Sequence, residues 1–246
     1  MAERHYSLLD GPAGGGNTGA GLSTFEELID LDMTSDKHRG LLCIWTDIDP
    51  AHETDFNRWH DREHMQERVA IPGFQSARRF AAVGDCPRPY LALYYTDALG
   101  VFLSEPYGRA FAHQTTWSLE NFKRMRGTQR RVGRLTLEAG EGEGSALALF
   151  VVPQAKLAEP GLLPLLMKRA VATTQEEFIV RATVLQTDAH LSTPVTADAV
   201  PAPADAVVMI EASRPQAAHA QAQLLAHSVG LQDADVYTFQ LLWRLD

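Results

Sequence analysis

Apolar and polar positions along residues 40 to 140 predict four strands and two helical regions. Compact runs of apolar, aromatic and β-branched residues, which are typical of strands, are separated by turn residues. The longer segment after the first run places Phe56 and Trp59 on one face at the helical period. The order is strand-helix-strand-strand-helix-strand. The predicted strands are Leu41–Ile48, Phe74–Val83, Tyr90–Thr96 and Arg130–Glu138, and the predicted helical regions run from Pro50 to Ala70 and from Asp97 to Arg126.

Cap and turn residues set the ends of the first predicted helix. Asp49 is a preferred capping residue, and Pro50 suits the first helical position because a backbone N–H there would have no helical partner. Pro72 and Gly73 end the helix, since such a dipeptide marks a turn. Asp97 is expected to cap the second helical region in the same way.

The same order of elements returns after the glycine-rich linker Gly140–Gly144. The repetition predicts two units, residues 39–140 and 145–246, although their sequences hardly match. Each unit has a split βαβ arrangement, whose sheet leaves one face uncovered, and a second copy can cover that face. We therefore expect a fused pseudo-dimer. The second set of predicted elements comprises strands Ala146–Val152, Glu177–Thr187, Ala206–Ala212 and Val236–Leu245, and helices Pro160–Ala172 and Pro215–Val229.

Residues 1–38 are predicted to form a flexible or loosely docked segment. They include the glycine-rich sequence GPAGGGNTGAG, which cannot pack into a core, followed by the acidic stretch Phe25–Asp36. The glycines do not match a phosphate-binding loop, because no strand precedes them and no Gly-Lys-Ser/Thr follows.

Net charge and cysteine content narrow the classes of partner. The formal charge of −9 argues against nucleic-acid binding, which needs clustered lysines and arginines. Two cysteines, Cys43 and Cys86, do not make a disulfide framework, so a cytoplasmic location is expected. No apolar run is long enough to span a membrane and no secretion signal is evident, so neither a membrane partner nor export is predicted.

The stretch from residue 55 to residue 79 holds the candidate catalytic residues. Trp59 must face the sheet, and Glu63 falls on the same helical face, so its carboxylate is carried toward the interior. A buried carboxylate is unfavourable unless it is paired or protonated. The next predicted strand offers Arg78 or Arg79 as the partner, and strand alternation does not show which of the two points inward.

His64 is the candidate general acid or base, because imidazole titrates near neutral pH and Glu63 can orient it. Arg78 or Arg79 would then stabilise an anion or oxyanion of the substrate. The alternative interpretation is a structural Glu–Arg ion pair beside an exposed histidine.

Several further side chains are expected to wall or complete the same site. Phe56 and Trp59 supply aromatic walls, and Tyr90 and Tyr94 share one strand face from which their hydroxyls can reach the substrate. His113, near the end of the second helical region, can reach the same cleft. We therefore predict these five residues as substrate-binding, together with whichever strand arginine faces the pocket.

His60 raises the question of a metal. Residues 60–64 spell H-D-R-E-H, which matches the H-x-x-E-H zinc pattern. Two histidines one helical turn apart can share a metal, and Glu63 could then activate water. No third ligand is evident downstream, so no metal site is predicted and His60 is added to the acid/base candidates. Haem or a divalent metal remains the alternative.

Three sequences carry a family resemblance: FNRWHDREHMQERVAIPGFQSARRF, PRPYLALYYTDALGVFLSEPYGRAF and WSLENFKRMRGTQRRVG. They resemble bacterial dimeric α+β barrel proteins, whose helix reads Phe-x-x-Trp-Tyr-x-x-Glu-His before Pro-Gly-Phe. The resemblance covers the first predicted unit and implies an α+β fold, with two ferredoxin-like βαββαβ units fused into a pseudo-dimeric α+β barrel. By position it implies roles for Trp59, Glu63, His64 and Arg79 or its neighbour. His60 stands where these relatives have Tyr.

The resemblance implies a fold more than a reaction, since this superfamily includes cofactor-free monooxygenases, polyketide cyclases, lactone isomerases and haem enzymes. We predict a cofactor-independent enzyme that uses histidine acid/base chemistry on a small aromatic or carbonyl-bearing substrate, as an isomerase, cyclase, lyase or monooxygenase. The alternatives are a non-catalytic binding or structural domain and a haem- or metal-dependent enzyme. The second unit lacks the motif, so one site per chain is expected. A fused repeat needs no partner to complete the barrel, but does not forbid a homo-oligomer.

Overall fold

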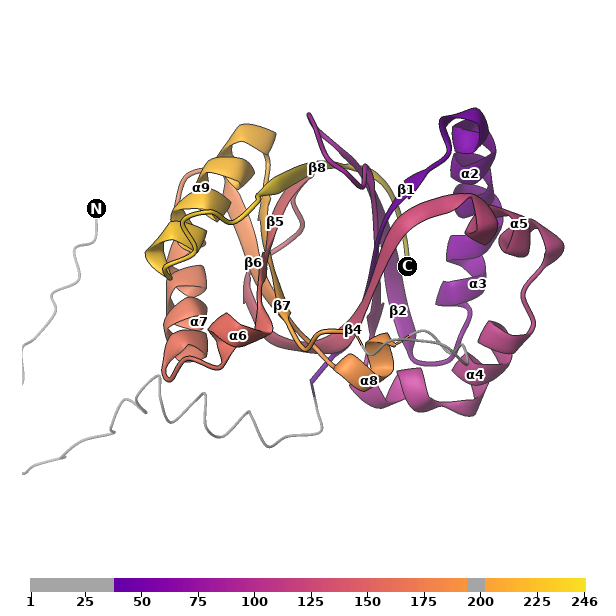
Figure 1. Ribbon diagram of the computed structural model, residues 1–246, viewed down its shortest axis with the longest axis horizontal. Helices are drawn as coiled ribbons and strands as arrows, with labels where there is room; N and C mark the ends of the chain where they lie inside the picture. The colour runs from indigo at the N-terminus through magenta and orange to yellow at the C-terminus, as the bar shows by residue number, and fades with distance from the viewer. Residues whose placement is uncertain (1–37, 194–201) are drawn as a thin grey trace, which may run out of the picture.

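Eight strands close into one antiparallel barrel (Figure 1). The structure is a computed structural model that describes residues 38–193 and 202–246, so the segment predicted as flexible, residues 1–38, lies outside the described residues except for its last residue. The order around the barrel is β1-β3-β2-β8-β5-β7-β6-β4. The strands are β1 (Gly40–Ile48), β2 (Phe74–Ala82), β3 (Tyr90–Thr96), β4 (Met125–Gly140), β5 (Ala146–Val152), β6 (Ile179–Thr187), β7 (Ala206–Ala212) and β8 (Tyr237–Leu245).

Each half of the chain contributes four neighbouring strands in the same order. Residues 40–140 supply β4-β1-β3-β2, and residues 146–245 supply β8-β5-β7-β6. Two antiparallel pairs, β2 with β8 and β4 with β6, join the halves and close the barrel. The α+β class and the barrel agree with the prediction. The repeated strand order is the arrangement that an interpretation as two βαββαβ units requires.

The first predicted helix is one continuous rod from Pro50 to Val69. As predicted, Asp49 caps it: its Oδ1 accepts a hydrogen bond of 3.0 Å from the Ala51 N–H, and Pro50 occupies the first position. The rod changes its winding on the way. It consists of a 3-10 turn η1 (Pro50–His52), helix α2 (Glu53–Trp59), a π-helical turn η2 (His60–His64) and helix α3 (Met65–Val69).

The second helical region is divided, and the prediction that Asp97 caps it was wrong. Ala98 stands at its N-cap position and makes no side-chain cap. The capping side chains are Ser104 and Thr115, whose hydroxyl oxygens accept the backbone N–H groups three residues ahead. None of the helices in the described ranges is both long and apolar enough to cross a membrane. The remaining helices are η3 (Leu99–Leu103), α4 (Glu105–Ala112), α5 (Thr116–Arg124), α6 (Gln154–Leu157), α7 (Leu162–Thr173), α8 (Ala189–Ser192) and α9 (Pro215–Ser228).

Apolar residues fill the interior of the barrel and cover its outer surface in both halves of the chain. Side chains from all eight strands form one buried cluster, which must therefore be the barrel interior. In Figure 1, α2, α3 and α5 lie outside the first four strands, and α7 and α9 lie outside the second four. The interior cluster consists of Leu41, Cys43, Trp45, Phe80, Leu91, Leu93, Tyr95, Leu135, Leu147, Leu149, Leu185, Val207, Met209 and Phe239.

Strand alternation separates the two arginines of β2. Arg78 shares the inward face with Phe80, and its guanidinium donates to both carboxylate oxygens of Glu211 on β7, at 2.9 and 2.8 Å. Both side chains of this pair are fully buried. Arg79 points the other way, toward the helical rod. The two neighbouring arginines therefore serve different layers of the molecule.

Candidate active site

The π-helical turn brings two aromatic rings of the rod together. The Met65 N–H donates to the carbonyl of His60, five residues earlier, where an α-helix would use the carbonyl four residues earlier. The rings of Trp59 and His64, also five residues apart, consequently pack against each other with centroids 4.4 Å apart and planes tilted by 31°. Single π turns inside α-helices occur frequently at functional sites.

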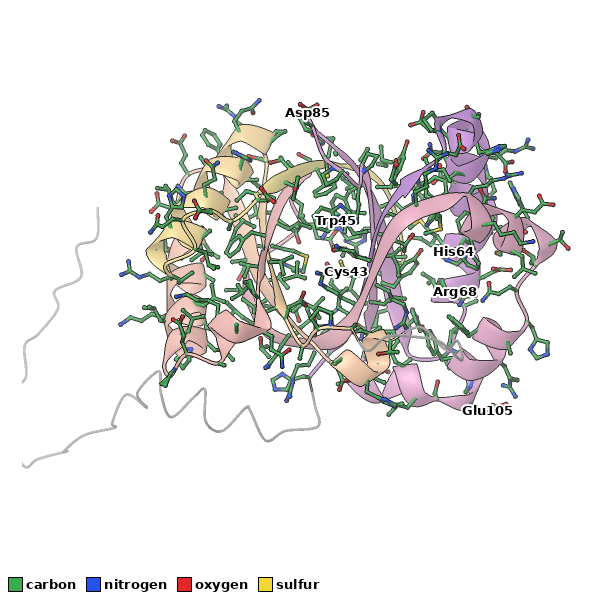
Figure 2. All side chains as sticks on the ribbon, in the orientation of Figure 1. Cys43, Trp45, His64, Arg68, Asp85 and Glu105 are labelled. Carbon is green, nitrogen blue, oxygen red and sulfur yellow. The ribbon has the colours of Figure 1, made fainter. Side chains whose placement is uncertain are left out.

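A cavity of about 560 Å³ lies between this rod, helices α4 and α5, and the outer face of β1 and β4. Its volume is within the usual range for small-molecule sites. Figure 2 places His64 and Arg68 on the helix side of the sheet, away from Cys43 and Trp45 inside the barrel. No aspartate or glutamate is among the described lining residues. The lining consists of Leu42, Ile44, Trp59, His60, His64, Arg68, Tyr94, Tyr107, Phe111, Gln114, Phe122, Met125, Thr128, Gln129, Arg130, Arg131, Ser192, Ala202 and Pro203.

Two buried histidines share the wall of this cavity. His60 is 4% exposed and His64 is 9% exposed, and their rings lie 5.3 Å apart. His60 Nε2 lies 3.4 Å from the Tyr94 hydroxyl. The Nδ1 atoms of both histidines are buried and have no hydrogen-bond partner within the described part of the chain.

Burial and nearby arginines keep both imidazoles neutral. Burial lowers the pKa of His60 well below its ordinary value of 6.5, and the charge of Arg79 adds to the effect. Burial likewise lowers the pKa of His64, with Arg68 and Arg79 adding to it. Burial raises the pKa of Tyr94, so its hydroxyl stays protonated. The cavity therefore presents two neutral imidazoles and a phenol.

Three arginines that the sequence analysis missed also line the cavity: Arg131, which pairs with Asp205, and Arg68 and Arg130. Arg68 follows His64 by one helical turn, is 5% exposed and donates from Nη2 to the Ala110 carbonyl at 3.3 Å. Spacing on the helix could have identified it. Arg130, on β4, donates to the Tyr107 hydroxyl at 3.0 Å. The position of Arg130 at the cavity depends on the register of β4, which the sequence does not show.

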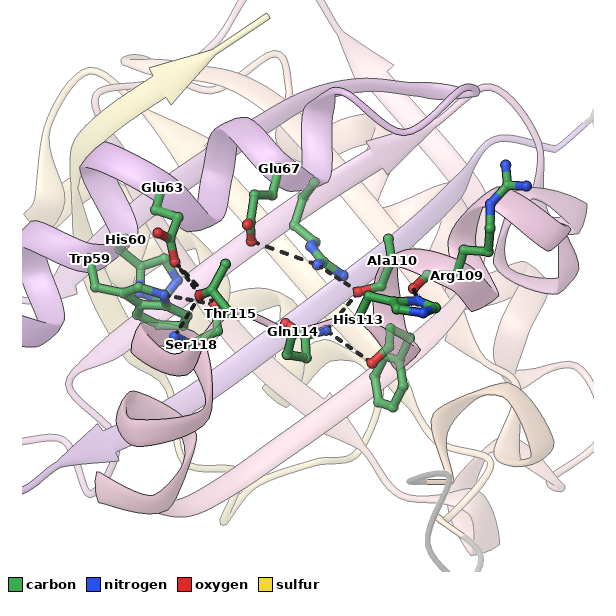
Figure 3. Close-up of polar contacts among 12 residues, drawn as sticks. Trp59, His60, Glu63, Glu67, Arg109, Ala110, His113, Gln114, Thr115 and Ser118 are labelled. Atoms are coloured by element: carbon green, nitrogen blue, oxygen red, sulfur yellow. Dashed lines mark hydrogen bonds and ion pairs between the residues drawn. The ribbon is translucent and has the colours of Figure 1, made fainter.

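Glu63 does not pair with an arginine or with His64, so that prediction was wrong. Its Oε1 accepts a hydrogen bond from Thr115 Oγ1 at 2.5 Å and lies 3.5 Å from Ser118 Oγ, both near the start of α5 (Figure 3). Ser118 Oγ in turn accepts from Trp59 Nε1 at 3.0 Å. Glu63 therefore lies outside the cavity lining and supports Trp59 through Ser118.

Neither strand arginine lines the cavity, contrary to the prediction. Arg78 is committed to Glu211 inside the barrel. Arg79 forms an ion pair with Asp61 and donates to Asn57 Oδ1 at 2.6 Å and to the Asn57 carbonyl at 3.4 Å. Its guanidinium thus fixes the helical rod to β2, because all of these acceptors belong to the rod.

Three other predicted substrate-binding residues also lie outside the lining. Phe56 packs behind the cavity, with its ring 4.9 Å from that of His60. Tyr90 bonds to the start of the rod, accepting from Asn57 Nδ2 at 3.3 Å. His113 is exposed, and its Nδ1 lies 2.9 Å from the Arg109 carbonyl. Of the ten predicted site residues, those that the structure gathers around the cavity are Trp59, His60, His64 and Tyr94.

The residues of the H-D-R-E-H segment do not fit a metal site. A metal-bound imidazole usually donates its other N–H to a carboxylate, carbonyl or water, which fixes the ring. Neither His60 nor His64 has a protein partner at Nδ1, and Glu63 is directed to α5. Within residues 38–193 and 202–246, no group of three or more His, Cys, Asp and Glu side chains is placed to hold a metal ion.

Comparisons with known proteins show the fold. No protein-family model and no curated protein matches the chain. An anthrone oxidase-like protein of known structure superimposes with a TM-score of 0.59 at 13% identity, covering 86% of this chain and 94% of that one. Two putative monooxygenases also superimpose. The Fusobacterium nucleatum protein has a TM-score of 0.55 at 7% identity, and the match covers 86% of this chain and 96% of that one. The Lactobacillus acidophilus protein has a TM-score of 0.52 at 10% identity, and the match covers 83% of this chain and 94% of that one. The chain therefore has the α+β barrel fold of these proteins.

Proposed function

We propose that the protein is a cofactor-independent enzyme that removes a proton from a small, largely apolar aromatic or carbonyl-bearing molecule. The observation that carries this proposal is the pair of neutral, buried imidazoles, His60 and His64, on the wall of an aromatic cavity of about 560 Å³. A neutral imidazole can accept a proton, and a cavity of this size takes a small aromatic molecule.

His64 is the base in this proposal. The Trp59 ring packs against His64 and holds its orientation. The low pKa by itself makes His64 a weak base, but an anion that forms beside the imidazolium favours the protonated state. Arg68, one turn away, takes the anion-stabilising role that we first assigned to the strand arginines. His60 and Tyr94, 3.4 Å apart, supply a second proton-transfer pair.

We favour oxygenation among the reactions that proton removal can begin. An enolate or phenolate formed at this site can react with dioxygen, so that a methylene group becomes a carbonyl, one O₂ is consumed and water is released. The names of the fold neighbours, an anthrone oxidase-like protein and two putative monooxygenases, agree with this choice. Isomerisation, cyclisation and elimination start from the same proton removal and are the second choice.

We further interpret the chain as a fusion of two ferredoxin-like units with one site in the first. The packing of the second unit supports this interpretation. Ala218 and Ala222 of α9 are fully buried against the outer face of β5, β6 and β7, together with Leu166 of α7. Small side chains let this helix approach the sheet closely, whereas the first unit carries Trp59 and two imidazoles in the corresponding layer.

The test uses anthrone, whose methylene group is acidified by its carbonyl. The wild-type protein is first treated with chelator and shown to be colourless. It is then expected to consume one O₂ for each anthraquinone formed. His64→Ala is expected to lose this activity while keeping its circular-dichroism spectrum. Turnover by His64→Ala at the wild-type rate, or turnover that appears only after haem or a metal is added, would contradict the proposal.

A further inference from the structure

Positive charge faces the cavity without a matching carboxylate. Arg68 is 5% exposed, and its Nε is buried with no hydrogen-bond partner. Its nearest carboxylate oxygen belongs to the partly exposed Glu67 and lies 4.0 Å away, at the limit of an ion pair. A guanidinium has five N–H donors, and leaving them unpaired in a buried place costs free energy. Arg68 therefore has donor capacity that the protein itself does not use.

Arg130 shows the same lack of a carboxylate. It donates to the Tyr107 hydroxyl at 3.0 Å and to the Leu191 carbonyl. Within the described part of the chain no acidic side chain lies within ion-pair distance of it. Two uncharged acceptors thus hold its guanidinium in place at the cavity wall without neutralising its charge.

Apart from Arg68, the buried arginines of the described residues are paired. Arg131, the next residue along β4, has an Asp205 oxygen 2.8 Å from its Nη2, and Arg78 has Glu211 at the same distance. Arg79 has Asp61. The fold thus neutralises these arginines, including Arg131 at the cavity wall, which sets Arg68 and Arg130 apart. A buried charge without a counter-ion is unfavourable, and Arg130 is half-buried at the wall of the same cavity as the buried Arg68. An anionic ligand is therefore the natural partner for both.

An unsatisfied acceptor lies beside Arg68. Gln114 donates from Nε2 to the same Ala110 carbonyl, at 2.9 Å, that receives Arg68 (Figure 3). Gln114 Oε1 is buried and has no partner within the described residues. This end of the cavity therefore offers cationic donors for an oxyanion and a neutral acceptor for a neighbouring hydroxyl, whereas Trp59 and Phe122 provide apolar wall elsewhere.

We propose that the substrate is an aromatic molecule that already carries an anionic oxygen group, a carboxylate or an ionised phenol, and that Arg68 and Arg130 bind this group. Gln114 accepts a hydrogen bond from an adjacent substrate hydroxyl. This inference deepens the proposed function. It rests on that proposal in one respect, namely that this cavity holds the substrate.

Binding of matched probes tests the inference without any turnover. Calorimetric titration at pH 7 with 2-naphthoate and with 2-naphthamide compares a carboxylate with a neutral group of the same shape. The naphthoate is expected to bind at least about tenfold more tightly, because hydrogen bonds to charged groups are the stronger ones. Arg68→Met and Arg130→Met are each expected to weaken naphthoate binding about tenfold to a hundredfold and to leave naphthamide nearly unchanged.

Arginines of the same elements outside the cavity supply the controls. Arg62 lies on the same rod as Arg68, and Arg126 lies on the same strand as Arg130, and both are exposed. Arg62→Met and Arg126→Met are expected to bind naphthoate as the wild type does. A third probe, 2-naphthol, identifies the source of the anion: if the cavity is built for a phenolate, its affinity for naphthol rises with pH and exceeds that for naphthoate.

Equal affinity for naphthoate and naphthamide, or binding of neither, would overturn the inference. If Arg68→Met does not fold, Arg130→Met and Arg68→Lys decide the outcome, since lysine keeps the charge but loses the planar donor pair. His64→Ala separates this inference from the proposed function. A naphthoate preference that persists in His64→Ala would support the anion site independently of catalysis. A wild-type protein that prefers naphthoate but turns over no anthrone would support the anion site and contradict the enzyme.

Discussion

The Trp59 and His64 rings are in contact, with centroids 4.4 Å apart, although the two residues are five positions apart along one helical rod. In a regular α-helix, residues five apart point about 140° away from one another, because each residue turns the helix by about 100°. The π turn at residues 60–64 reduces this divergence. It places the His64 imidazole over the tryptophan at the cavity wall, and the chemistry that we propose depends on this placement.

The first prediction concerns the proton acceptor. His64→Ala is expected to lower kcat by about a hundredfold to ten-thousandfold, the usual contribution of a positioned general base. The cavity already surrounds His64, so the shortened side chain should change the melting temperature little. Steady-state kinetics with anthrone and a thermal melt of the same preparation measure the two effects.

His113→Ala is the matched control for that variant. His113 is exposed at the end of α4, outside the cavity lining, although the sequence placed it among the substrate-binding residues. Its removal is expected to leave kcat and KM unchanged. Equal losses of activity in the two variants would show that neither histidine acts through the cavity.

The second prediction concerns the acceptor between the rod and α5. Glu63→Gln is expected to keep kcat within the same order of magnitude, because Glu63 bonds to Thr115 and Ser118 and does not face the cavity. Glu63→Ala removes the acceptor and should lower the free energy of unfolding by about 1 kcal/mol. Urea titration beside kinetics measures both. A loss of activity in Glu63→Gln as large as that in His64→Ala would restore Glu63 as the catalytic partner.

These two residues show how far the sequence can predict the site. The helix, its cap at Asp49 and its aromatic face follow from local patterns and are present. Projection onto a regular helix gave the wrong direction for Glu63, because the residue types do not predict a π turn. Arg130 lies 62 positions after Arg68 and reaches the same cavity only because β4 pairs with β1.

The two arginines of β2 likewise show what the sequence cannot predict. Which of Arg78 and Arg79 points inward depends on the register of β2, and both neighbours of β2 had to be known to fix it. Arg78 found its partner, Glu211, in the other half of the chain, 133 residues away. Local pattern thus predicted the elements, and long-range pairing decided which face each side chain occupies.

The third prediction concerns pH. Both His60 and His64 have a pKa well below 6.5 in the folded protein, whereas in the unfolded chain each titrates near that value. Below pH 6.5 the unfolded chain therefore binds more protons than the folded one. The free energy of unfolding is complete above pH 6.5 and falls as the pH drops below it, by up to about 1.4 kcal/mol per pH unit for each histidine.

A double variant isolates this contribution. His60→Gln/His64→Gln cannot titrate at these positions, so its free energy of unfolding should fall less steeply than that of the wild type between pH 6.5 and 5. Urea titrations across this range measure the slopes. Identical slopes for the two proteins would mean that the histidines are not held neutral by the fold.

The fourth prediction concerns the buried pair inside the barrel. Arg78→Met leaves the Glu211 carboxylate buried without its counter-ion and is expected to cost about 3–5 kcal/mol of unfolding free energy. Adding Glu211→Gln removes the charge, and the glutamine oxygen can still accept the Gly144 N–H that Glu211 accepts at 3.0 Å. The double variant should therefore recover most of the loss, as urea titration would show. Because the pair lies inside the barrel, the double variant should also keep the wild-type kcat. A stable double variant without activity would mean that Arg78 reaches the substrate after all.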